Sequence, residues 1–440
     1  MKLTVFQADK GDCILITGQG GKNILADGGM IGSYKDYVRP AMGDLSTAGE
    51  AIDLVYLSHI DRDHIGGVLQ LMDDAVDWRV YDYQASLGNS SFRKPKFPRP
   101  PQMKAIWHNN FKDQVQDNSG AIEEQLAANS RLLNMNTLLI GEKKMALAQM
   151  AEDYAELTYS VKDGLQLSQR VGENQLGIPV NPEFDGGLIF ADEAPPRISI
   201  GGMDLYIIGP FKADLEKLRQ EWNDWLKENQ AIVAEVRAEA EQDAQFLPMD
   251  EGQLVLSSML ALSTRLGDRD RVTTPNLASV MLLVEEAGKT LLMTGDGHWE
   301  DILKGLDRQQ KFDSQDRLHV DVLKVQHHGS EHNIHEDFCK AISADHYIFC
   351  GNGAHENPNL DVLQMMIDAR FSLPAGHPQA GKKFKFWFNS SVNYAGTEDR
   401  VEHMQAVKDL VDEAARKSGR KLHYRFLTRG SKQELDLTGF

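Results

Sequence analysis

The residues LSHIDRDHIGG at positions 57–67 constrain the fold of this chain more than any other stretch. They place four side chains that can bind metal ions within six positions: His59, Asp61, Asp63 and His64. The apolar residues 52–57 (IDLVYL) are typical of a short buried strand. We therefore expect the first three ligands on a loop that leaves a strand, and the last at the start of the next helix. Gly66 and Gly67 have no side chains, which would allow that helix to approach the sheet closely.

Mixed imidazole and carboxylate ligands bind divalent ions of the zinc and manganese group, and a set this dense can hold two ions. The alternative is a solvated acidic turn with two incidental histidines, but the pattern HxDxDHxGG after a hydrophobic strand is long for a coincidence. The stretch resembles the second motif of the metallo-β-lactamase superfamily, and most of all the branch typified by the soluble domain of ComEC-type competence proteins. Asp61 stands in the place of the superfamily's second histidine. The resemblance implies a first metal site that is rich in oxygen, which favours zinc less and admits manganese or iron.

Two further aspartates follow predicted strands. Asp27 follows the strand predicted at 23–26, and it could fix the tautomer of a ligating histidine such as His64. An ordinary Asp-Gly turn explains Asp27 equally well. Asp296 ends a TGD sequence after two apolar strands, which resembles the fourth motif of the same family. The resemblance implies that Asp296 bridges two ions, because the two oxygens of a carboxylate can face different metals.

A pair of histidines follows the apolar strand predicted at 320–325, in the sequence QHHGS. This sequence resembles the fifth motif of the branch. Neighbouring side chains of a strand point to opposite faces, so one histidine can bind metal while the other lines the substrate cleft. We favour His327 as the ligand, and the spacing leaves His328 open. Ser330 could donate a hydrogen bond to a substrate oxyanion.

Two more histidines are candidates for the same site. His108 follows a short apolar strand, and the family takes a third histidine ligand from this part of the chain. A hydrogen-bonded structural histidine is the alternative. His355 lies in the sequence HENP, an altered form of the Asn-x-x-His-Pro stretch of the competence-type hydrolases. A phosphodiesterase would use such a histidine to hold a nonbridging oxygen or to protonate the leaving group.

The balance of charge limits contact with nucleic acid. Lys and Arg number 47 against 65 Asp and Glu, which gives a formal net charge of -18. Such a surface repels bulk polyanions, so any contact with nucleic acid has to be local. Residues 90–104 (SSFRKPKFPRPPQMK) are the candidate basic patch, because they combine basic residues and prolines with no acid. A solvated loop without function is the alternative.

The location is predicted from what the chain contains. No run is long and apolar enough to span a bilayer, and the N-terminus has no signal-peptide layout. The three cysteines have no framework spacing, which favours a reducing compartment. We expect a cytoplasmic protein that makes no contact with a membrane.

The predicted fold is a metallo-β-lactamase αβ/βα sandwich with a helical insertion. Strands that end in candidate ligands occur in both halves of the chain, so residues 1–110 and 196–440 are assigned to the hydrolase domain. Residues 111–195 are assigned to a helical insertion or cap. A further helix at 212–246, with an apolar stripe of leucine and tryptophan, is expected to project.

Two other stretches have less certain roles. Residues 78–83 have strand character. Residues 381–388 (GKKFKFWF) interleave lysine with aromatic residues. They form either a stacking surface for bases or an edge strand that lysine protects from aggregation.

The predicted activity is hydrolysis with two divalent ions, zinc or manganese, that activate a shared water. The metal ligands are His59, Asp61, Asp63, His64, His108, Asp296 and one or both of His327 and His328. The catalytic residues are Asp63, Asp296, Ser330 and His355. We favour a phosphodiesterase or nuclease that takes its substrate through the basic patch. A hydrolase of lactones, thioesters or β-lactams is the second option. The third is a phage-defence or signalling component that docks a partner protein through its helical cap.

Overall fold

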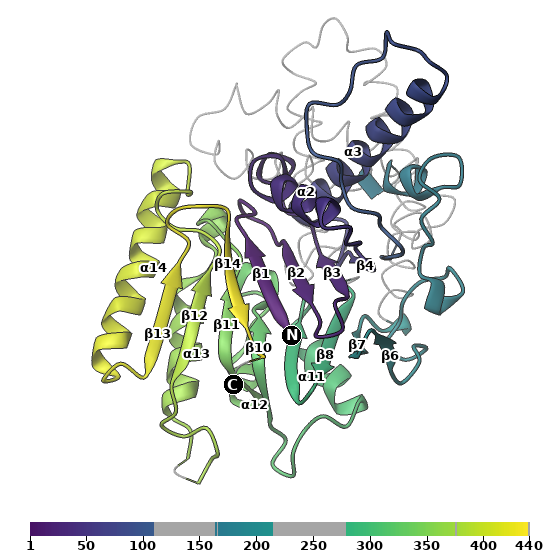
Figure 1. Cartoon of the computed structure of the whole chain (residues 1–440). Helices are drawn as coiled ribbons and strands as arrows, with labels where there is room; N and C mark the ends of the chain where they lie inside the picture. The colour runs from purple at the N-terminus through teal and green to yellow at the C-terminus, as the bar shows by residue number, and fades with distance from the viewer. Residues whose placement is uncertain (110–162, 165, 214–278, 375, 439–440) are drawn as a thin grey trace, which may run out of the picture.

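The computed structural model describes residues 1–109, 163–164, 166–213, 279–374 and 376–438. Two β-sheets lie face to face in this part of the chain, and helices cover the outer face of each sheet (Figure 1). The expected αβ/βα sandwich is therefore confirmed.

The first sheet has the strand order β14-β1-β2-β3-β4-β5. Its strands are β1 (Lys2–Phe6), β2 (Ile14–Thr17), β3 (Asn23–Ala26), β4 (Leu54–Tyr56), β5 (Ile106–Trp107) and β14 (Lys432–Asp436). Strands β3, β4 and β5 run parallel, so their carboxyl ends lie at the same edge of the sheet. Strand β14, which we did not predict, pairs antiparallel with β1.

The second sheet has the strand order β13-β12-β11-β10-β9-β8-β7-β6. Neighbouring strands are antiparallel from β6 to β9 and parallel from β9 to β13. The turn between β6 and β7 holds Gly201 and Gly202 at φ angles of 58° and 100°, and glycine accepts these positive angles without steric cost. The strands are β6 (Ile198–Ile200), β7 (Met203–Gly209), β8 (Met281–Glu286), β9 (Lys289–Met293), β10 (Leu318–Lys324), β11 (Ile342–Phe349), β12 (Phe384–Phe388) and β13 (Leu422–Phe426).

The helices pack in two groups. Those on the first sheet are α1 (Ile31–Ser33), the π-helix η1 (Tyr34–Val38), α2 (Arg39–Thr47) and α3 (Arg62–Ser86). Those on the second sheet are α11 (Trp299–Arg308), α12 (Glu336–Ala341), α13 (Leu360–Phe371) and α14 (Glu398–Lys417). Short 3-10 turns are η3 (Pro182–Phe184), η4 (Gln326–Gly329) and η5 (Ala354–Glu356). The long helix α3 begins beside the sheet and extends beyond it (Figure 1).

Apolar side chains fill three layers, one between the sheets and one under each group of helices. Successive side chains of a strand point to opposite faces, so each strand contributes to two layers. In β2, Ile14 faces the other sheet and Leu15 faces the helices. In β8, Leu282 and Leu283 divide in the same way. The continuous apolar runs in the sequence therefore belong to strands that are buried on both faces.

The predicted strand at 78–83 is wrong, because α3 continues without interruption to Ser86. The aromatic and β-branched residues of this segment favour strands by propensity. In the helix, Trp78 is buried while Val80 and Tyr83 remain exposed. Burial of one helical face therefore outweighs the local propensity.

Both predictions for residues 381–388 are also wrong. Strand β12 lies between β11 and β13, so it is not an edge strand. The rings of Phe384, Phe386 and Phe388 are buried in the layer beneath α13 and α14, so they cannot stack on bases.

The predicted projecting helix at 212–246 lies outside the described residues beyond position 213, as does most of the predicted insertion at 111–195. The described part of that insertion contributes Leu167, Val171 and Ile178 to the layer under the first group of helices. Among the helices that the structure describes, none combines the length and the apolar character needed to cross a bilayer.

Candidate metal centre

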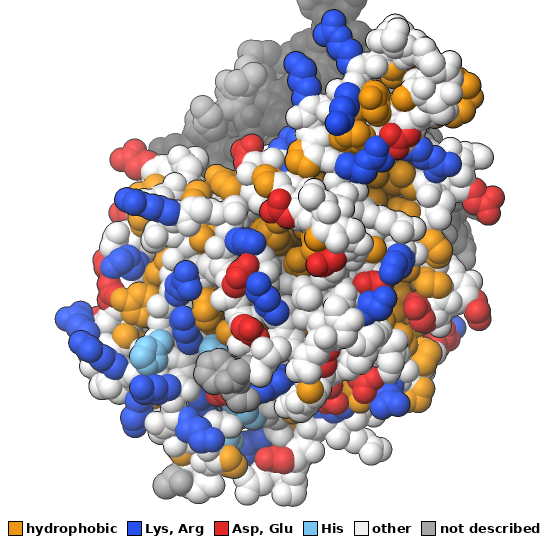
Figure 2. Space-filling view, in the orientation of Figure 1, with side chains coloured by type: hydrophobic (Ala, Val, Ile, Leu, Met, Phe, Trp, Pro, Cys, Tyr) orange, Lys and Arg blue, Asp and Glu red, His pale blue; other side chains and the backbone are white. Residues whose placement is uncertain are grey.

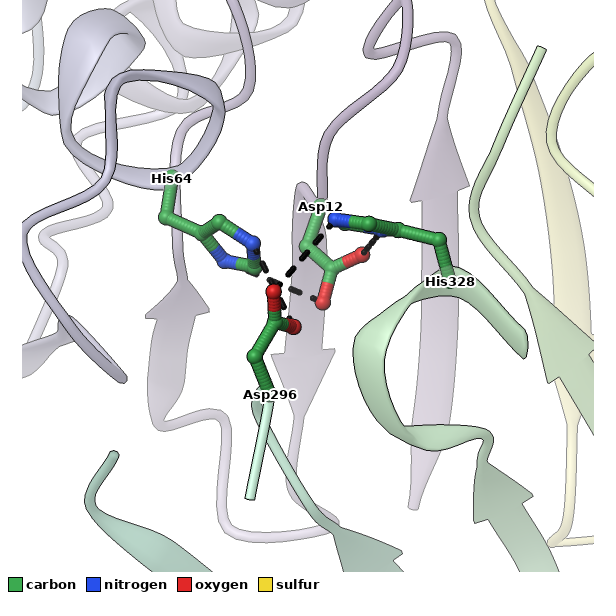
Figure 3. A group of neighbouring side chains, drawn as sticks. All are labelled: Asp12, His64, Asp296 and His328. Atoms are coloured by element: carbon green, nitrogen blue, oxygen red, sulfur yellow. Dashed lines mark ion pairs between the residues drawn. The ribbon is translucent and has the colours of Figure 1, made fainter. Parts of the chain in front are cut away.

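The candidate site lies where the carboxyl ends of β3, β4, β9 and β10 meet between the two sheets. These strands lead into Asp27, the segment 59–64, Asp296 and the turn η4 respectively. The turn between β1 and β2 adds Asp12 from a fifth direction. Figure 3 shows four of these side chains, from distant parts of the sequence, pointing toward a common centre.

Two histidines of the first sheet direct their Nε2 atoms at Asp296. The His59 Nε2 atom lies 3.6 Å from Asp296 Oδ2 and 3.5 Å from Asp61 Oδ2. The His64 Nε2 atom lies 3.5 Å from the other oxygen, Asp296 Oδ1. Both Nε2 atoms and Asp296 Oδ1 are buried and have no hydrogen-bond partner. Asp296 therefore presents one oxygen to each histidine, and its bridging role stays a prediction.

Asp27 lies behind His64. Its Oδ2 atom is 3.0 Å from His64 Nδ1 and accepts a hydrogen bond of 2.8 Å from the Ser58 hydroxyl. Its Oδ1 atom accepts the Ser58 backbone N–H at 2.8 Å. A proton held on Nδ1 by this carboxylate leaves Nε2 free to bind a cation.

The two histidines of the QHHGS sequence both turn toward Asp296. Strand β10 ends at Lys324, and His327 and His328 follow in a turn with positive φ angles of 43° and 55°. The alternation of a strand therefore does not apply to them. The His328 Nε2 atom lies 3.3 Å from Asp63 Oδ2 and 3.6 Å from Asp296 Oδ2.

His327 is the more exposed of the pair. Its Nε2 atom lies 3.8 Å from Asp296 Oδ2, and its Nδ1 atom is 2.6 Å from Asn333 Oδ1. Asn333 in turn donates to the Asp296 carbonyl at 2.8 Å. Among the two histidines, only His328 also reaches Asp63 at ion-pair distance in the described structure.

The separations in this group fit a metal ion better than direct hydrogen bonds. Two ligand atoms about 2.1 Å from one ion at tetrahedral angles lie about 3.4 Å apart. The Nε2 atoms of His59, His64 and His328 lie 3.3 to 3.6 Å from the carboxylate oxygens that they face. The unpaired buried atoms and this spacing show that the residues present suit divalent ions. The number and identity of the ions stay predictions.

Electrostatics in the metal-free site also favour cations. Burial opposes a charge on His328, but Asp296, Asp12 and Asp63 outweigh it and raise the pKa of His328 to about 9. Burial likewise opposes a charge on His64, yet Asp296, Asp27 and Asp12 raise its pKa well above the usual value. Burial would raise the pKa of Asp296, but the surrounding histidines hold it well below its ordinary range. Protons thus occupy the positions that metal ions would take.

The start of α3 is shaped by the site. Asp61 is the N-cap residue, but its side chain makes no capping hydrogen bond and faces His59. An aspartate at the N-cap normally stabilises a helix by a hydrogen bond from its side chain, so the absence of that bond at Asp61 indicates a role beside His59 instead. Gly67 allows the helix to pack closely, because a Cβ atom there would lie 1.9 Å from the Gly28 oxygen. The predicted close approach of this helix is therefore confirmed.

Three other predicted residues lie outside this group. His108 is buried at the end of β5, where burial lowers its pKa to about 4 and its Nδ1 atom has no hydrogen-bond partner. It is therefore neutral at pH 7, as a ligand must be. Ser330 is buried in the turn after η4, with its hydroxyl 3.4 Å from the His332 N–H. His355 is exposed on η5. The roles predicted for these three stay predictions.

Comparison with known families adds an independent observation. Residues 7–77 match the family model described as Metallo-beta-lactamase superfamily. This segment contains Asp12, Asp27 and the HxDxDH pattern, and it forms strands β2, β3 and β4 of the first sheet. The two-sheet sandwich is consistent with the metallo-β-lactamase fold. Curated proteins give no match to the chain.

Members of the metallo-β-lactamase superfamily are generally hydrolases. The match and the buried cluster of Asp12, His64, Asp296 and His328 together support a metal-dependent hydrolase. The closer resemblance to competence proteins stays a prediction.

Sequence reasoning missed two members of the site, Asp12 and Lys324. Both are buried, and they form an ion pair with each other. The signals were present, because Asp12 directly precedes an apolar strand and Lys324 is a lone cation in the buried run VDVLKV. Their proximity could not be predicted, since 311 positions separate them in the chain and only the docked sheets bring them together.

Proposed function

We propose that the protein is a phosphodiesterase or nuclease that uses two divalent ions, zinc or manganese. The observation that carries the proposal is the arrangement around Asp296, whose two oxygens face different unpaired histidine nitrogens. The buried group contains five carboxylates and one ammonium, which leaves four negative charges. Two divalent ions would balance that charge. The five carboxylates are Asp12, Asp27, Asp61, Asp63 and Asp296.

Each side of the site would hold one ion. His59 and Asp61 would hold the first, and Asp63, His64 and His328 the second. Asp296 lies between them, with Oδ2 facing His59 and His328 and Oδ1 facing His64. When bound, such ions supply a nucleophile by lowering the pKa of water from about 15.7 toward about 7, and they neutralise charge on the substrate. The chain contributes the fixed ligand geometry and a buried floor that excludes other water.

The choice of a phosphodiester substrate rests on a surface at the far end of α3, which we call the α3 tip. It contains exposed apolar side chains with exposed fractions from 41% to 63%. They are Val80, Tyr83, Leu87 and Phe92. Basic side chains of the predicted arm lie among them, and Figure 2 shows apolar and basic groups together at this end of the molecule. The basic residues are Arg93, Lys94, Lys96 and Arg99.

Contacts hold part of this arm in place. The Arg99 guanidinium pairs with both oxygens of Asp82 at 2.6 and 2.7 Å and lies 4.3 Å from the Trp78 ring centre. Lys94 lies 5.4 Å from the same ring. The arm is therefore anchored to α3, while Arg93 and Lys96 are exposed. Trp78 is buried, so the rings available for base stacking are those of the exposed Tyr83 and Phe92. Exposed aromatic rings and cations on one surface suit single-stranded nucleic acid, through base stacking and phosphate contacts.

The distance between the α3 tip and the metal centre sets a minimum substrate length. Helix α3 has 25 residues and begins at the metal centre, so its far end lies about 37 Å away at 1.5 Å per residue. That span equals about eleven stacked nucleotides at about 3.4 Å each. Only substrates of about this length or longer would contact both places.

The free state of all three cysteines fits the proposed reducing, cytoplasmic location. Cys13, Cys339 and Cys350 are free and buried. Burial raises the pKa of each thiol, so none is poised for disulfide chemistry.

Metal analysis and a substrate panel test the proposal. The panel contains single-stranded DNA, RNA, cyclic nucleotides, bis(p-nitrophenyl) phosphate, a lactone and nitrocefin. Wild type should bind two divalent ions per chain and cleave phosphodiesters. Asp296→Ala should lose metal and at least about a thousandfold in rate, since the metal ions supply several kcal/mol of stabilisation.

The matched control is Asp321→Ala, which removes a carboxylate from β10 outside the site. Asp321 pairs with Lys289 at 3.0 Å, so this variant should keep both metal and activity. Hydrolysis of nitrocefin or the lactone without any phosphodiester cleavage would reverse the proposed substrate class. Absence of bound divalent ions in the wild type would reject the proposal as a whole.

A further inference from the structure

The histidines that face Asp296 from opposite sides each have a carboxylate behind the ring. His64 Nδ1 lies 3.0 Å from Asp27 Oδ2, and His328 Nδ1 lies 3.3 Å from Asp12 Oδ1. Both Nε2 atoms face Asp296, at 3.5 and 3.6 Å. Each ring therefore has a carboxylate on its Nδ1 side. The contact is a hydrogen bond for His64 and an ion-pair distance for His328, and the two aspartates come from different loops.

Asp12 belongs behind the ligands and not among them. It approaches His328 at Nδ1, and it approaches His64 at Nδ1 as well, at 3.9 Å. The two nitrogens of an imidazole point in different directions, so a group on the Nδ1 side cannot share an ion with Nε2 of the same ring. Asp12 lies within 4.8 Å of the other three members of the cluster, but on the wrong side of both rings to complete their coordination.

The other oxygen of Asp12 is held by Lys324. The Lys324 side chain is fully buried at the end of β10, pairs with Asp12 Oδ2 and donates to the Gly295 carbonyl at 3.1 Å. It also lies 3.7 Å from Asp296 Oδ1. A buried ammonium is retained only where charged and polar partners compensate for lost water. For Lys324 these partners are the Gly295 carbonyl, which directly precedes Asp296, and the Asp12 carboxylate behind His328.

We infer that Lys324 and Asp12 are positioning residues: Lys324 fixes the Asp12 carboxylate, and Asp12 fixes the ring of His328 so that Nε2 faces Asp63 and Asp296. The inference rests on the proposed metal centre and goes beyond it, because it assigns roles to two residues that do not bind the ions. Both sheets contribute to this chain of contacts, since Asp12 lies between β1 and β2 and Lys324 ends β10.

A double-mutant cycle tests the inference in the full-length protein. The variants are Lys324→Met, Asp12→Asn and the double variant, with Lys289→Met as the matched control. Lys289 lies in the neighbouring strand and pairs with Asp321, outside the site. The readouts are the affinity for Zn²⁺ in competition with a chelator and the visible absorption spectrum of the Co²⁺-loaded protein.

Each single variant should bind its weaker ion about 10–100-fold less tightly, as loss of a group that orients a ligand does. Each should also alter the Co²⁺ spectrum. Because Lys324 acts through Asp12, the double variant should lose no more than the more severe single variant. Lys289→Met should match wild type in both readouts.

Additive losses in the double variant would show that Lys324 and Asp12 act separately and would overturn the inference. Unchanged affinity and spectrum in Asp12→Asn would overturn it as well. Lys324→Gln is the second lysine variant, because its amide can still donate to Asp12, and its affinity should lie between wild type and Lys324→Met. If neither lysine variant folds by circular dichroism, Lys324 is a structural core residue and not a positioning residue. A wild type without bound metal rejects the proposed function instead, so the two failures are distinguishable.

Discussion

His64 and His328 face the same carboxylate, but the molecule holds them in place by different means. His64 lies in the first turn of α3, where its backbone N–H donates to Asp61 at 2.8 Å, and the aspartate behind it accepts two bonds from Ser58. All of these residues belong to the first sheet and its loops. His328 lies in a turn with positive φ, and its support comes from Asp12, across the sandwich, which pairs with the buried Lys324 at the end of β10.

The difference shows that the candidate metal centre combines side chains positioned by neighbours in sequence with side chains positioned by contacts between the two sheets. The His64 side requires a strand, a loop and a helix start that are close in sequence. The His328 side requires that the two sheets dock, because Asp12 and Lys324 meet only then. A backbone with positive φ at a non-glycine residue costs free energy, so the contacts that hold η4 in place must offset that cost.

The largest expected effects come from removing either histidine. His64→Ala and His328→Ala should each lower phosphodiester cleavage by about a thousandfold, because each takes away a direct ligand. His327→Ala should cost less, since His327 does not reach Asp63 and is half-exposed. The three variants are compared with wild type by their steady-state rates of bis(p-nitrophenyl) phosphate cleavage. A more severe defect in His327→Ala than in His328→Ala would break the comparison and restore His327 as the ligand.

The next effect concerns the support of His64. Asp27→Asn should weaken binding of one ion by about 10–100-fold, through a misoriented His64. The Co²⁺ spectrum should change differently from that of Asp12→Asn, because the two aspartates orient ligands on opposite sides of Asp296. Identical spectra for the two variants would contradict separate roles. Chelator competition and absorption spectroscopy provide the measurement.

A smaller effect is expected at the α3 tip, which contrasts with the buried centre in being exposed and basic. The double variant Tyr83→Ala with Phe92→Ala should bind a 30-nucleotide single strand at least roughly fivefold less tightly, because one stacked base contributes about 1–3 kcal/mol. Fluorescence anisotropy with the Asp296→Ala background measures binding without cleavage. Phe371→Ala is the matched control, since Phe371 has an exposed fraction of 41% on α13.

The same two substitutions, made in the wild-type background with Asp296 intact, provide a test of substrate length. Cleavage of bis(p-nitrophenyl) phosphate should be unchanged, because that substrate cannot reach the α3 tip. Equal losses on short and long substrates would show that the substitutions disturb the fold and not a binding surface.

The smallest effect is a shift of stability with pH in the metal-free protein. The pKa of His328 is raised from 6.5 to about 9, so its protonated form stabilises the fold fully below about pH 6.5. That contribution is lost as the pH rises through about 9, and the melting temperature of chelator-treated protein should fall by a few degrees over this window. Metal-loaded protein should not show the fall, because the ion replaces the proton. Differential scanning calorimetry at pH 6.5 and 9 measures the melting temperatures of the metal-free and the metal-loaded protein. An equal change of melting temperature with pH in the two forms would contradict the prediction.

Much of the fold could be predicted from local patterns. The apolar runs before Asp27, Asp296 and the QHHGS sequence are strands. Helix α3 begins at Arg62, so His64 lies near its start as expected, but the prediction that Asp63 lies on the preceding loop is wrong, because Asp63 is in the first turn of the helix. The prediction failed at Trp78 and Tyr83, where propensity favours a strand but the pattern of burial requires a helix. It also failed at β12, because a sequence does not show which strands lie on either side of another.

The sequence by itself predicted the types and most of the positions of the candidate ligands, since they follow strands whose ends can be read from apolar patterns. Only the tertiary structure decided which residues surround each histidine. Asp12 and Lys324 carry no local pattern that connects them, and His327 and His328 take directions that the turn sets and the alternation of a strand does not. The physical reason is that ligand identity depends on neighbours in sequence, whereas ligand orientation depends on charges that meet across the two docked sheets.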